Sequence, residues 1–356
     1  MIRAAASFFS GPGFTGLARL VGLEVILPGG LSPIYLASRR EVCGRSPLEG
    51  APALSLEGIG GPGPGRREDE MPSKKQTLAR WLCAAGLDRL GLRVQGLLGP
   101  SFVRALNYHD VPPERAQDFE RQLAFYAERF DCYGVSDLRA LYAGRPKSSR
   151  PGLILTFDDG LRSHADVVAP LLEQFGWTGW FMVPVAFVDT PPEEQVDFAA
   201  AHSIGHKNHV YDDARIALSW DDVRALSGKH VVGCHTWNHT RLADSLDAAA
   251  LEEEIPRAKR RLETELNQPV DVFAWVGGEE AAYSAQAARV IDDAGFDLSF
   301  MTNNAVIRPG DHPLQIQRTN VEAWDSEAVV RFQLSGLLDL GYRAKRRRVN
   351  RLTETR

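Results

Sequence analysis

The sequence predicts an α/β fold built around a mostly parallel sheet, either open or closed into a barrel. From residue 103 onward, short apolar runs of strand length alternate with longer stretches of helical periodicity, which is the order of repeated βα units. Two of the apolar runs, 153–155 and 231–234, lead into carboxylates and histidines. In a barrel the loops after the strands form the active face, so both motifs are expected at one end.

The individual elements follow from apolar periodicity and from capping signals. Strands are expected at 103–108, 152–157, 178–183, 231–234, 270–275, 297–301 and 314–317. Helices are expected at 113–130, 136–142, 164–175, from 219 onward, and at 246–267, 284–294 and 325–338. Ser136 is the expected cap of the second helix, and Ser219 opens the fourth. Pro256 must kink the helix 246–267 or mark its true beginning, because proline has no amide hydrogen to donate.

Composition limits the class of protein. The 356 residues are 44% hydrophobic and 24% charged, as in an ordinary soluble protein with ample material for a core. A formal net charge of -5 gives no reason to expect nucleic-acid binding. The 4 cysteines form no CxxC pair, so neither a zinc ribbon nor a disulfide framework is indicated.

Four regions are expected along the chain. Residues 1–70 are rich in Gly, Pro, Ala and Ser, as in a disordered leader, and Met71 is hypothesised to be the native start. No apolar run approaches the ~20 residues of a membrane span, and a secretory signal is weak. An amphipathic helical segment is expected at 71–101, the βα repeats at 102–340 and a basic tail at 341–356.

The motif Asp158-Asp159-Gly160 follows the apolar run 153–155 directly. Adjacent carboxylates raise each other's pKa unless a cation lies nearby, so a metal at Asp159 would leave Asp158 ionised beside it as a general base. Gly160 permits the sharp turn that aims both carboxylates into one cleft. The alternative is an ordinary turn, since Asp and Gly are both turn formers.

A second motif follows the strand expected at 231–234, where His235 and His239 lie four residues apart. Such a pair also occurs by chance. Neutral imidazoles suit zinc or a similar borderline metal, with cobalt or nickel as alternatives, whereas calcium and magnesium prefer oxygen ligands. One carboxylate and two histidines leave a coordination position open, as in catalytic zinc sites. Together, the two motifs predict a metal-dependent hydrolase.

The segments 156–160 and 235–239 resemble the first two motifs of the NodB-type polysaccharide deacetylases, carbohydrate esterase family four. The segments 107–111 and 235–238 are most similar to the branch that contains poly-N-acetylglucosamine deacetylases, and the resemblance covers roughly 103–338. It implies a distorted (β/α) barrel with fewer than eight strands, and hydrolysis of an N-acetyl group on a sugar. By matching positions it implies Asp158 as catalytic base, with Asp159, His235 and His239 as metal ligands.

The sequence departs from that family at the later motifs. The stretch 273–278 lacks the arginine and proline of an Arg-x-Pro-x-Gly motif, and 314–318 lacks the histidine that serves as general acid. His109 is the preferred proton donor or substrate contact. The alternatives are His312 or a histidine of a loop that is otherwise a solvated insertion, namely His202, His206 or His209. The expected substrate contacts are Trp275, Trp237 and Arg318, although tryptophan is more often plain core.

The expected partner is an N-acetylated sugar polymer or a lipid-linked oligosaccharide. The basic cluster 343–351 is by default a solvated helix or tail, and alternatively a contact with anionic lipid. The expected location is cytoplasmic, peripheral to the membrane if the tail binds lipid. Two other functions remain open: an amidase acting on a non-sugar C–N bond, and a non-catalytic glycan-binding module on the same fold.

Overall fold

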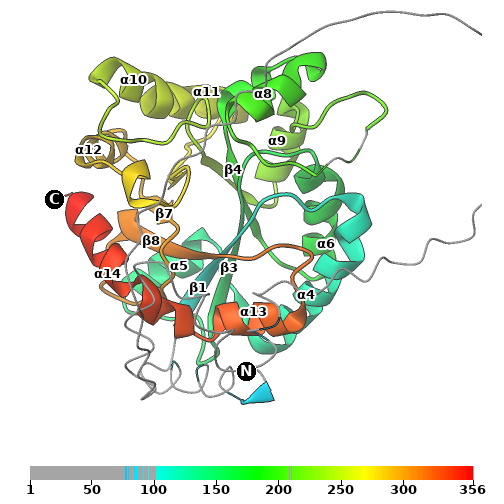
Figure 1. Ribbon diagram of the computed structural model, residues 1–356, viewed down its shortest axis with the longest axis vertical. Helices are drawn as coiled ribbons and strands as arrows, with labels where there is room; N and C mark the ends of the chain where they lie inside the picture. Colours follow the sequence, from blue (N-terminus) through cyan, green and yellow to red (C-terminus); the bar gives the residue numbers. More distant parts are fainter. Residues whose placement is uncertain are drawn as a thin grey trace, which may run out of the picture.

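The computed structural model describes residues 102–207, 209 and 211–355, together with 77, 79, 84–86, 91 and 95. The predicted leader 1–70, the start at Met71 and most of the segment 71–101 lie outside the described residues. Within the described chain, seven parallel strands close into a barrel surrounded by helices (Figure 1). The ring closes because β1 (Val103–Tyr108) pairs with β3 (Gly152–Phe157) on one side and with β8 (Ile316–Asn320) on the other.

The remaining strands complete the ring in chain order. They are β4 (Gly179–Val183), β5 (Val231–Cys234), β6 (Val272–Ala274) and β7 (Leu298–Met301). The two-residue strand β2 (Asp131–Cys132) pairs with the first two residues of β3, whereas β4 pairs with the last three. Because every pairing is parallel, the carboxyl ends of the strands meet at one end of the barrel.

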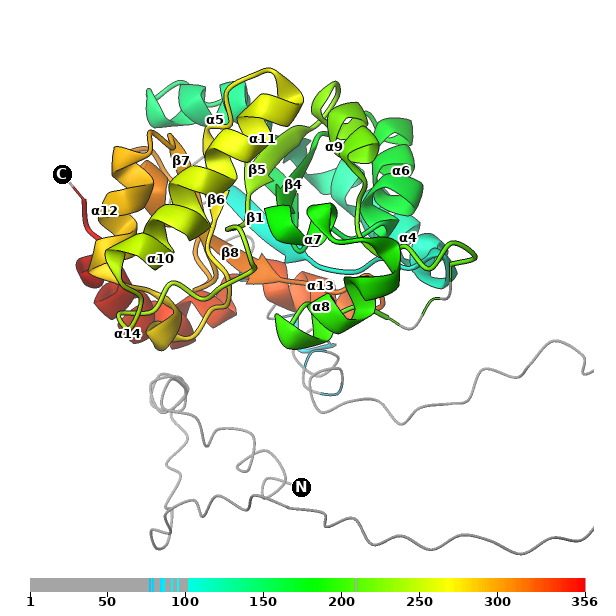
Figure 2. The same cartoon turned by 90° about the horizontal axis from the view of Figure 1, so that it is seen from above.

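Helices pack around the outside of the barrel, as the view from above shows (Figure 2). They are α4 (Ala116–Arg129), α5 (Val135–Tyr142), α6 (Ala169–Gln174), α7 (Val185–Asp189), α8 (Gln195–Ala201), α9 (Trp220–Ser227), α10 (Ala248–Glu252), α11 (Ala258–Leu266), α12 (Ala285–Asp293), α13 (Glu327–Leu334) and α14 (Leu337–Leu352). None of the helices in the described part of the chain is both long and apolar enough to cross a membrane.

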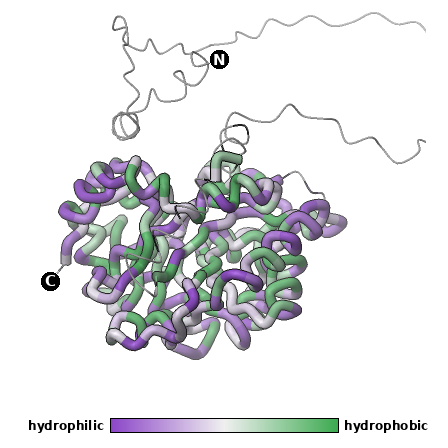
Figure 3. The backbone as a smooth tube through the Cα atoms, turned by 90° about the horizontal axis from the view of Figure 1, so that it is seen from below, coloured by the Kyte–Doolittle hydropathy of each residue, from purple (hydrophilic) through white to green (hydrophobic). Residues whose placement is uncertain are grey.

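The apolar side chains form two main layers, one inside the barrel and one between strands and helices. In β3, Ile154 points into the inner cluster with Trp180 and Phe300, whereas Leu153 and Leu155 belong to the outer cluster. This alternation is the period of two expected of a strand. Figure 3 shows apolar positions concentrated in the middle of the molecule and hydrophilic positions toward its outside.

The predicted fold class is confirmed, and all seven predicted strands are present. Some helix boundaries differ from the predicted ones, because local hydrogen bonds and a proline determine them and the apolar pattern does not. The N-cap of α5 is Gly134, not Ser136, because Asp137 accepts a hydrogen bond from the Gly134 amide. The helix expected at 246–267 is interrupted by a π-helical segment, Glu253–Arg257, which accommodates Pro256. The prediction also missed β2, α7 and α8. The basic cluster, expected as a helix or a tail, is helical and lies within α14.

Candidate active site and metal centre

The turn after β3 aims two carboxylates into the top of the barrel. Asp159 and Gly160 both adopt left-handed backbone, with φ of 79° and 64°. Gly160 also lies against the strand β4 and its following residue, since a Cβ there would be 3.1 Å from Pro184 Cδ. A left-handed aspartate is uncommon and costs free energy, and such strain is often found at functional sites. The predicted sharp turn is therefore present, and it places Asp158 and Asp159 side by side.

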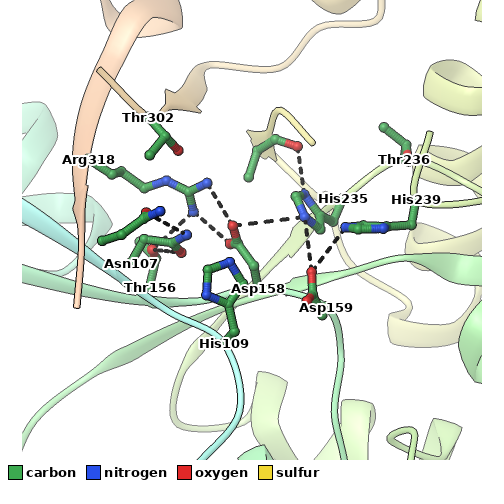
Figure 4. A network of polar contacts seen from close by, with 12 residues as sticks. Asn107, His109, Thr156, Asp158, Asp159, His235, Thr236, His239, Thr302 and Arg318 are labelled. Carbon is green, nitrogen blue, oxygen red and sulfur yellow. Dashed lines mark hydrogen bonds and ion pairs between the residues drawn. The ribbon is translucent and has the colours of Figure 1, made fainter. Parts of the chain in front are cut away.

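Asp159 meets both predicted histidines. Its Oδ1 lies 3.1 Å from His239 Nε2 and 3.6 Å from His235 Nε2, and all three residues are buried (Figure 4). His239 is held in left-handed backbone, with φ of 56°, as is Thr236 between the two ligands, with φ of 65°. The two histidines thus project from a tight turn after β5 and not from a helix.

The orientation of the imidazoles fits a cation. His235 Nδ1 lies 2.9 Å from Ala274 O, and His239 Nδ1 lies 2.7 Å from His202 O. A carbonyl oxygen only accepts hydrogen bonds, so each Nδ1 carries the hydrogen and each neutral ring turns an Nε2 lone pair toward Asp159. Three acceptors within 4.8 Å of one another repel unless a cation lies among them or a ring takes up a proton. Asp159, His235 and His239 are therefore suited to hold a divalent metal.

The electrostatics of Asp159 support this role. Burial raises the pKa of its carboxyl group, but His235, His239 and His109 lower it, and the net pKa lies well below the usual range. Asp159 is therefore ionised near neutral pH, which is the form that binds a metal. Burial lowers the pKa of His239, but the interaction with Asp159 raises it by a larger amount, so the net pKa lies above the usual value.

One buried carboxylate holds the turn that carries the histidines. Glu254 accepts hydrogen bonds from the amides of Trp237 and Asn238, from Asn238 Nδ2 and from Thr240 Oγ1. Glu254 comes from the π-helical segment between α10 and α11. The sequence analysis missed it, since the acidic run 252–254 fits a helix N-terminus equally well.

Asp158 is held by Arg318, which lies at the centre of β8. The guanidinium donates from Nη1 to Asp158 Oδ1 at 2.6 Å and from Nη2 to Oδ2 at 2.8 Å (Figure 4). Nη1 also donates to Thr156 Oγ1 at 3.0 Å. Burial raises the pKa of Asp158, but Arg318, His235 and His109 outweigh it, so the net pKa is below its usual range. Asp158 is thus an ionised carboxylate fixed beside the metal ligands.

This geometry corrects the prediction for Arg318. The side chain is buried and its hydrogen bonds go to Asp158 and Thr156, so it is not a substrate contact. The sequence gives no sign of this contact, because the two partners are 160 positions apart in the chain and become neighbours only when the barrel closes.

His109 lies on the other side of Asp158 from the metal ligands, at the end of β1 (Figure 4). Its Nδ1 is 3.7 Å from Glu322 Oε1, and a third of the side chain is exposed. Burial lowers the pKa of His109, but Glu322, Asp159 and Asp158 raise it, to a net value of about 9. His109 is therefore protonated near neutral pH and can donate a proton.

A cavity of about 410 Å³ joins these groups. Asp158, Asp159, His109, His235 and His239 all line it. The segment 203–207 and the loop after β8 also line the cavity, and they meet where Lys207 Nζ lies 4.1 Å from the centre of the Trp324 ring. The sequence analysis did not single out Trp324, which is half-buried and the tryptophan that lines this cavity.

The other predicted contacts are located elsewhere. Trp275 is 1% exposed and donates its indole N–H to Ser299 Oγ, which contradicts a role as a sugar-binding wall. Trp237 packs under Arg257, whose guanidinium carbon lies 3.8 Å from the ring centre, and does not line the cavity. His312 caps the turn before β8, and His209 pairs with Glu114. Of the loop histidines, His206 lines the cavity.

Comparison with known proteins agrees with this site. Residues 145–299 match the family described as Polysaccharide deacetylase. The chain is 27% identical over 146 residues to the poly-beta-1,6-N-acetyl-D-glucosamine N-deacetylase of Escherichia coli strain K12, which covers 38% of this chain and 20% of that protein. The chain thus spans about a fifth of the length of the curated relatives that it matches.

Two solved structures share the fold. Streptococcus pyogenes deacetylase PplD in complex with acetate superposes with a TM-score of 0.52 at 17% identity, covering 65% of this chain and 98% of that one. A de-N-acetylase from Aggregatibacter actinomycetemcomitans gives 0.51 at 14% identity, covering 65% and 100%. At these identities the likeness shows the fold alone. The matched segment 145–299 carries Asp158 and the metal-suited triad after β3 and β5, and it is this part of the barrel that is similar to the polysaccharide deacetylase family.

Proposed function

We propose that this protein is a metal-dependent hydrolase that removes N-acetyl groups from a sugar. The observation that carries the proposal is the arrangement of an ionised Asp158, fixed by Arg318, directly beside the triad of Asp159, His235 and His239. Asp158 Oδ2 lies 3.9 Å from His235 Nε2, so a base and the metal-suited triad face the same space. Glycan binding alone does not require an ionised carboxylate fixed beside a metal-suited triad, whereas hydrolysis does.

The described residues divide the proposed chemistry among them. A zinc-class ion held by the triad would supply Lewis acidity to the acyl carbonyl and to water, with cobalt or nickel as alternatives. Asp158 takes the proton of the attacking water, and Arg318 keeps its carboxylate aimed at that proton. His109, protonated, gives a proton to the amine as the C–N bond breaks. Trp324 offers a ring face to the sugar at the rim of the same cavity.

The relatives suggest the substrate class. The curated relatives are named for deacetylation of poly-beta-1,6-N-acetyl-D-glucosamine, and we propose an N-acetylglucosamine polymer or a lipid-linked saccharide for this chain. A lipid-linked saccharide would suit a peripheral membrane contact through the basic tail. The cytoplasmic location stays a prediction, and cell fractionation followed by immunodetection is its test.

Acetate release tests the proposed activity. The metal-loaded protein is expected to release acetate from N-acetylglucosamine oligomers, and Asp158→Asn to lower the rate by about 10²–10⁴-fold, because the base is lost. Acetate is measured by a coupled enzymatic assay, and metal content by elemental analysis shows that Asp158→Asn still holds its ion. Full activity of Asp158→Asn would contradict the assignment of the base. Release from simple N-acetyl amides but not from sugars would instead favour an amidase, and no release by the loaded protein would favour a binding module.

Metal stoichiometry tests the triad separately from turnover. One divalent ion per chain is expected by elemental analysis, with Asp159→Asn and His239→Gln each weakening binding, because each variant removes a ligand atom of the buried set. His206→Gln is the matched control, since His206 lines the same cavity but does not belong to the triad. Equal metal content in all three variants would refute the triad as the binding site.

A further inference from the structure

The C-terminal helix α14 has two unlike sides. Between Leu337 and Leu352 the sequence carries six basic residues and one acid, Asp339. The inner side is docked on the barrel: Lys345 donates to Gly278 O, Arg346 donates to Asn303 O at 3.0 Å, and Arg348 pairs with Glu280 at 2.6 Å. These contacts explain why the basic segment forms a helix that packs on the barrel.

The outer side of α14 presents arginines without partners. Arg343, Arg347 and Arg351 are exposed, and the spacing of four residues aligns them along one stripe. Within the described part of the chain, none of the three meets a carboxylate or makes a hydrogen bond through its side chain. The stripe borders a groove of about 510 Å³, lined by Arg343, Arg346, Arg347, Asn350 and Arg351.

The charges in this groove are crowded. Burial lowers the pKa of Arg346, and the neighbouring charges of Arg104 and Arg343 lower it further against the opposing effect of Asp339. An anion in the groove would relieve this repulsion. Guanidinium groups suit phosphate in particular, because their planar fork donates two parallel hydrogen bonds to its oxygens.

An apolar residue belongs to the same outer face. Leu340 is 50% exposed, which is unusual for a large apolar side chain in this protein, and it lies one helical turn before Arg343 and two before Arg347. A helix with cations and an exposed leucine on one face is typical of segments that lie in the plane of a membrane surface. The rest of the protein brings the formal net charge to -5, so attraction to an anionic surface would be confined to this face.

We propose that the outer face of α14 docks the protein on an anionic lipid surface. Arg343, Arg347 and Arg351 bind lipid phosphates, and Leu340 enters the interface between headgroups and acyl chains. The helix also touches the cavity wall, because Lys345 donates to the carbonyl of Gly278, a residue that lines the cavity. Docking would therefore hold the cavity near the headgroups, where a lipid-linked saccharide would be presented; this last step rests on the proposed function, whereas docking does not.

Vesicle binding tests the proposal without any substrate. The full chain is mixed with vesicles of phosphatidylglycerol or of phosphatidylcholine and sedimented, and the bound fraction is measured. Binding to phosphatidylglycerol, little binding to phosphatidylcholine, and weakening with added salt are expected. The double variant Arg347→Gln/Arg351→Gln is expected to lower the partition coefficient about thirtyfold, from the loss of two surface cations.

A matched double variant controls for charge alone. Arg145→Gln/Arg289→Gln removes two exposed arginines that lie outside α14, and it is expected to bind as the unaltered protein does. Thermal melting of both double variants checks that each is folded. Equal losses in the two variants, or equal binding to both lipids, would overturn the proposal. Release of the protein from the vesicles by inorganic phosphate at matched ionic strength would indicate a site for a soluble phosphate. Release by duplex DNA would indicate a nucleic-acid site, and either result would overturn the proposal.

Discussion

Replacing Arg318 by methionine is expected to reduce both activity and stability. Methionine keeps the length and apolar stem of the side chain but leaves Asp158 buried without the guanidinium that pairs with it. Breaking a buried ion pair in this way costs about 3–5 kcal/mol in the free energy of unfolding. Activity is expected to fall by about 10²-fold or more, because Asp158 loses the two hydrogen bonds that aim it.

A neighbouring arginine provides the control. Arg104 on β1 is also fully buried, and it pairs with Asp339 at 2.7 Å and with Gln95 at 2.8 Å, away from the cavity. Arg104→Met is expected to lower the free energy of unfolding but to leave kcat/KM per folded molecule unchanged. Chemical denaturation and steady-state kinetics of both variants separate the two effects. If Arg318→Met kept full kcat/KM, Arg318 would be a structural residue alone.

Replacing His109 by asparagine is expected to lower kcat by about 10²–10⁴-fold, the usual contribution of a positioned general acid. The proposed role requires a protonated His109, so the activity of the unaltered protein is expected to fall as the pH rises through the pKa of this ring. That pKa is about 9 in the described structure, where Asp159 and Asp158 help to raise it. A cation bound at Asp159 offsets part of the negative charge that raises this pKa. The loss of activity at high pH, which is the basic limb of the pH–kcat profile, is therefore expected below pH 9 in the metal-loaded protein.

Glu322 gives this assignment a second test. The carboxylate lies 3.7 Å from His109 Nδ1 and raises its pKa, so Glu322→Gln should move the basic limb of the pH–kcat profile toward lower pH while leaving the acidic limb in place. Glu280→Gln is the matched control, because Glu280 pairs with Arg348 on the surface and not with the cavity. A basic limb that does not move in Glu322→Gln, or that persists in His109→Asn, would exclude His109 as the acid.

The sequence predicted best what depends on neighbours in the chain. Strand β5 ends at Cys234, as its apolar run indicates, and His235 and His239 follow in the next turn. The pair Asp158 and Asp159 was equally visible, because the turn that aims them is encoded by the adjacent Gly160. The (β/α) order of the barrel could likewise be predicted from alternating periodicities.

What sequence reasoning missed depends on partners that meet only in the folded chain. The sequence predicts Arg318 as a substrate contact, because nothing near it in the chain indicates that β8 faces Asp158. Trp275 and Trp324 are the same residue type, and only packing buries the former and leaves the latter at the cavity. Glu254 binds the turn that carries the histidines from within a π-helical segment, a local irregularity that apolar periodicity does not encode.

The closure of the barrel through β1 has a chemical consequence. The segment that matches the family, 145–299, carries the metal-suited triad and Asp158. His109, which directly follows β1, and Arg318, which lies in β8, are outside that segment, and β1 and β8 pair to close the ring. The register Ala105↔Arg318 brings these strands together and sets both residues around one carboxylate. Closure of the barrel therefore brings together the residues proposed for proton transfer. A chain whose first and last strands came apart would keep the metal-suited triad and Asp158, but Asp158 would lose both His109 and Arg318 as neighbours.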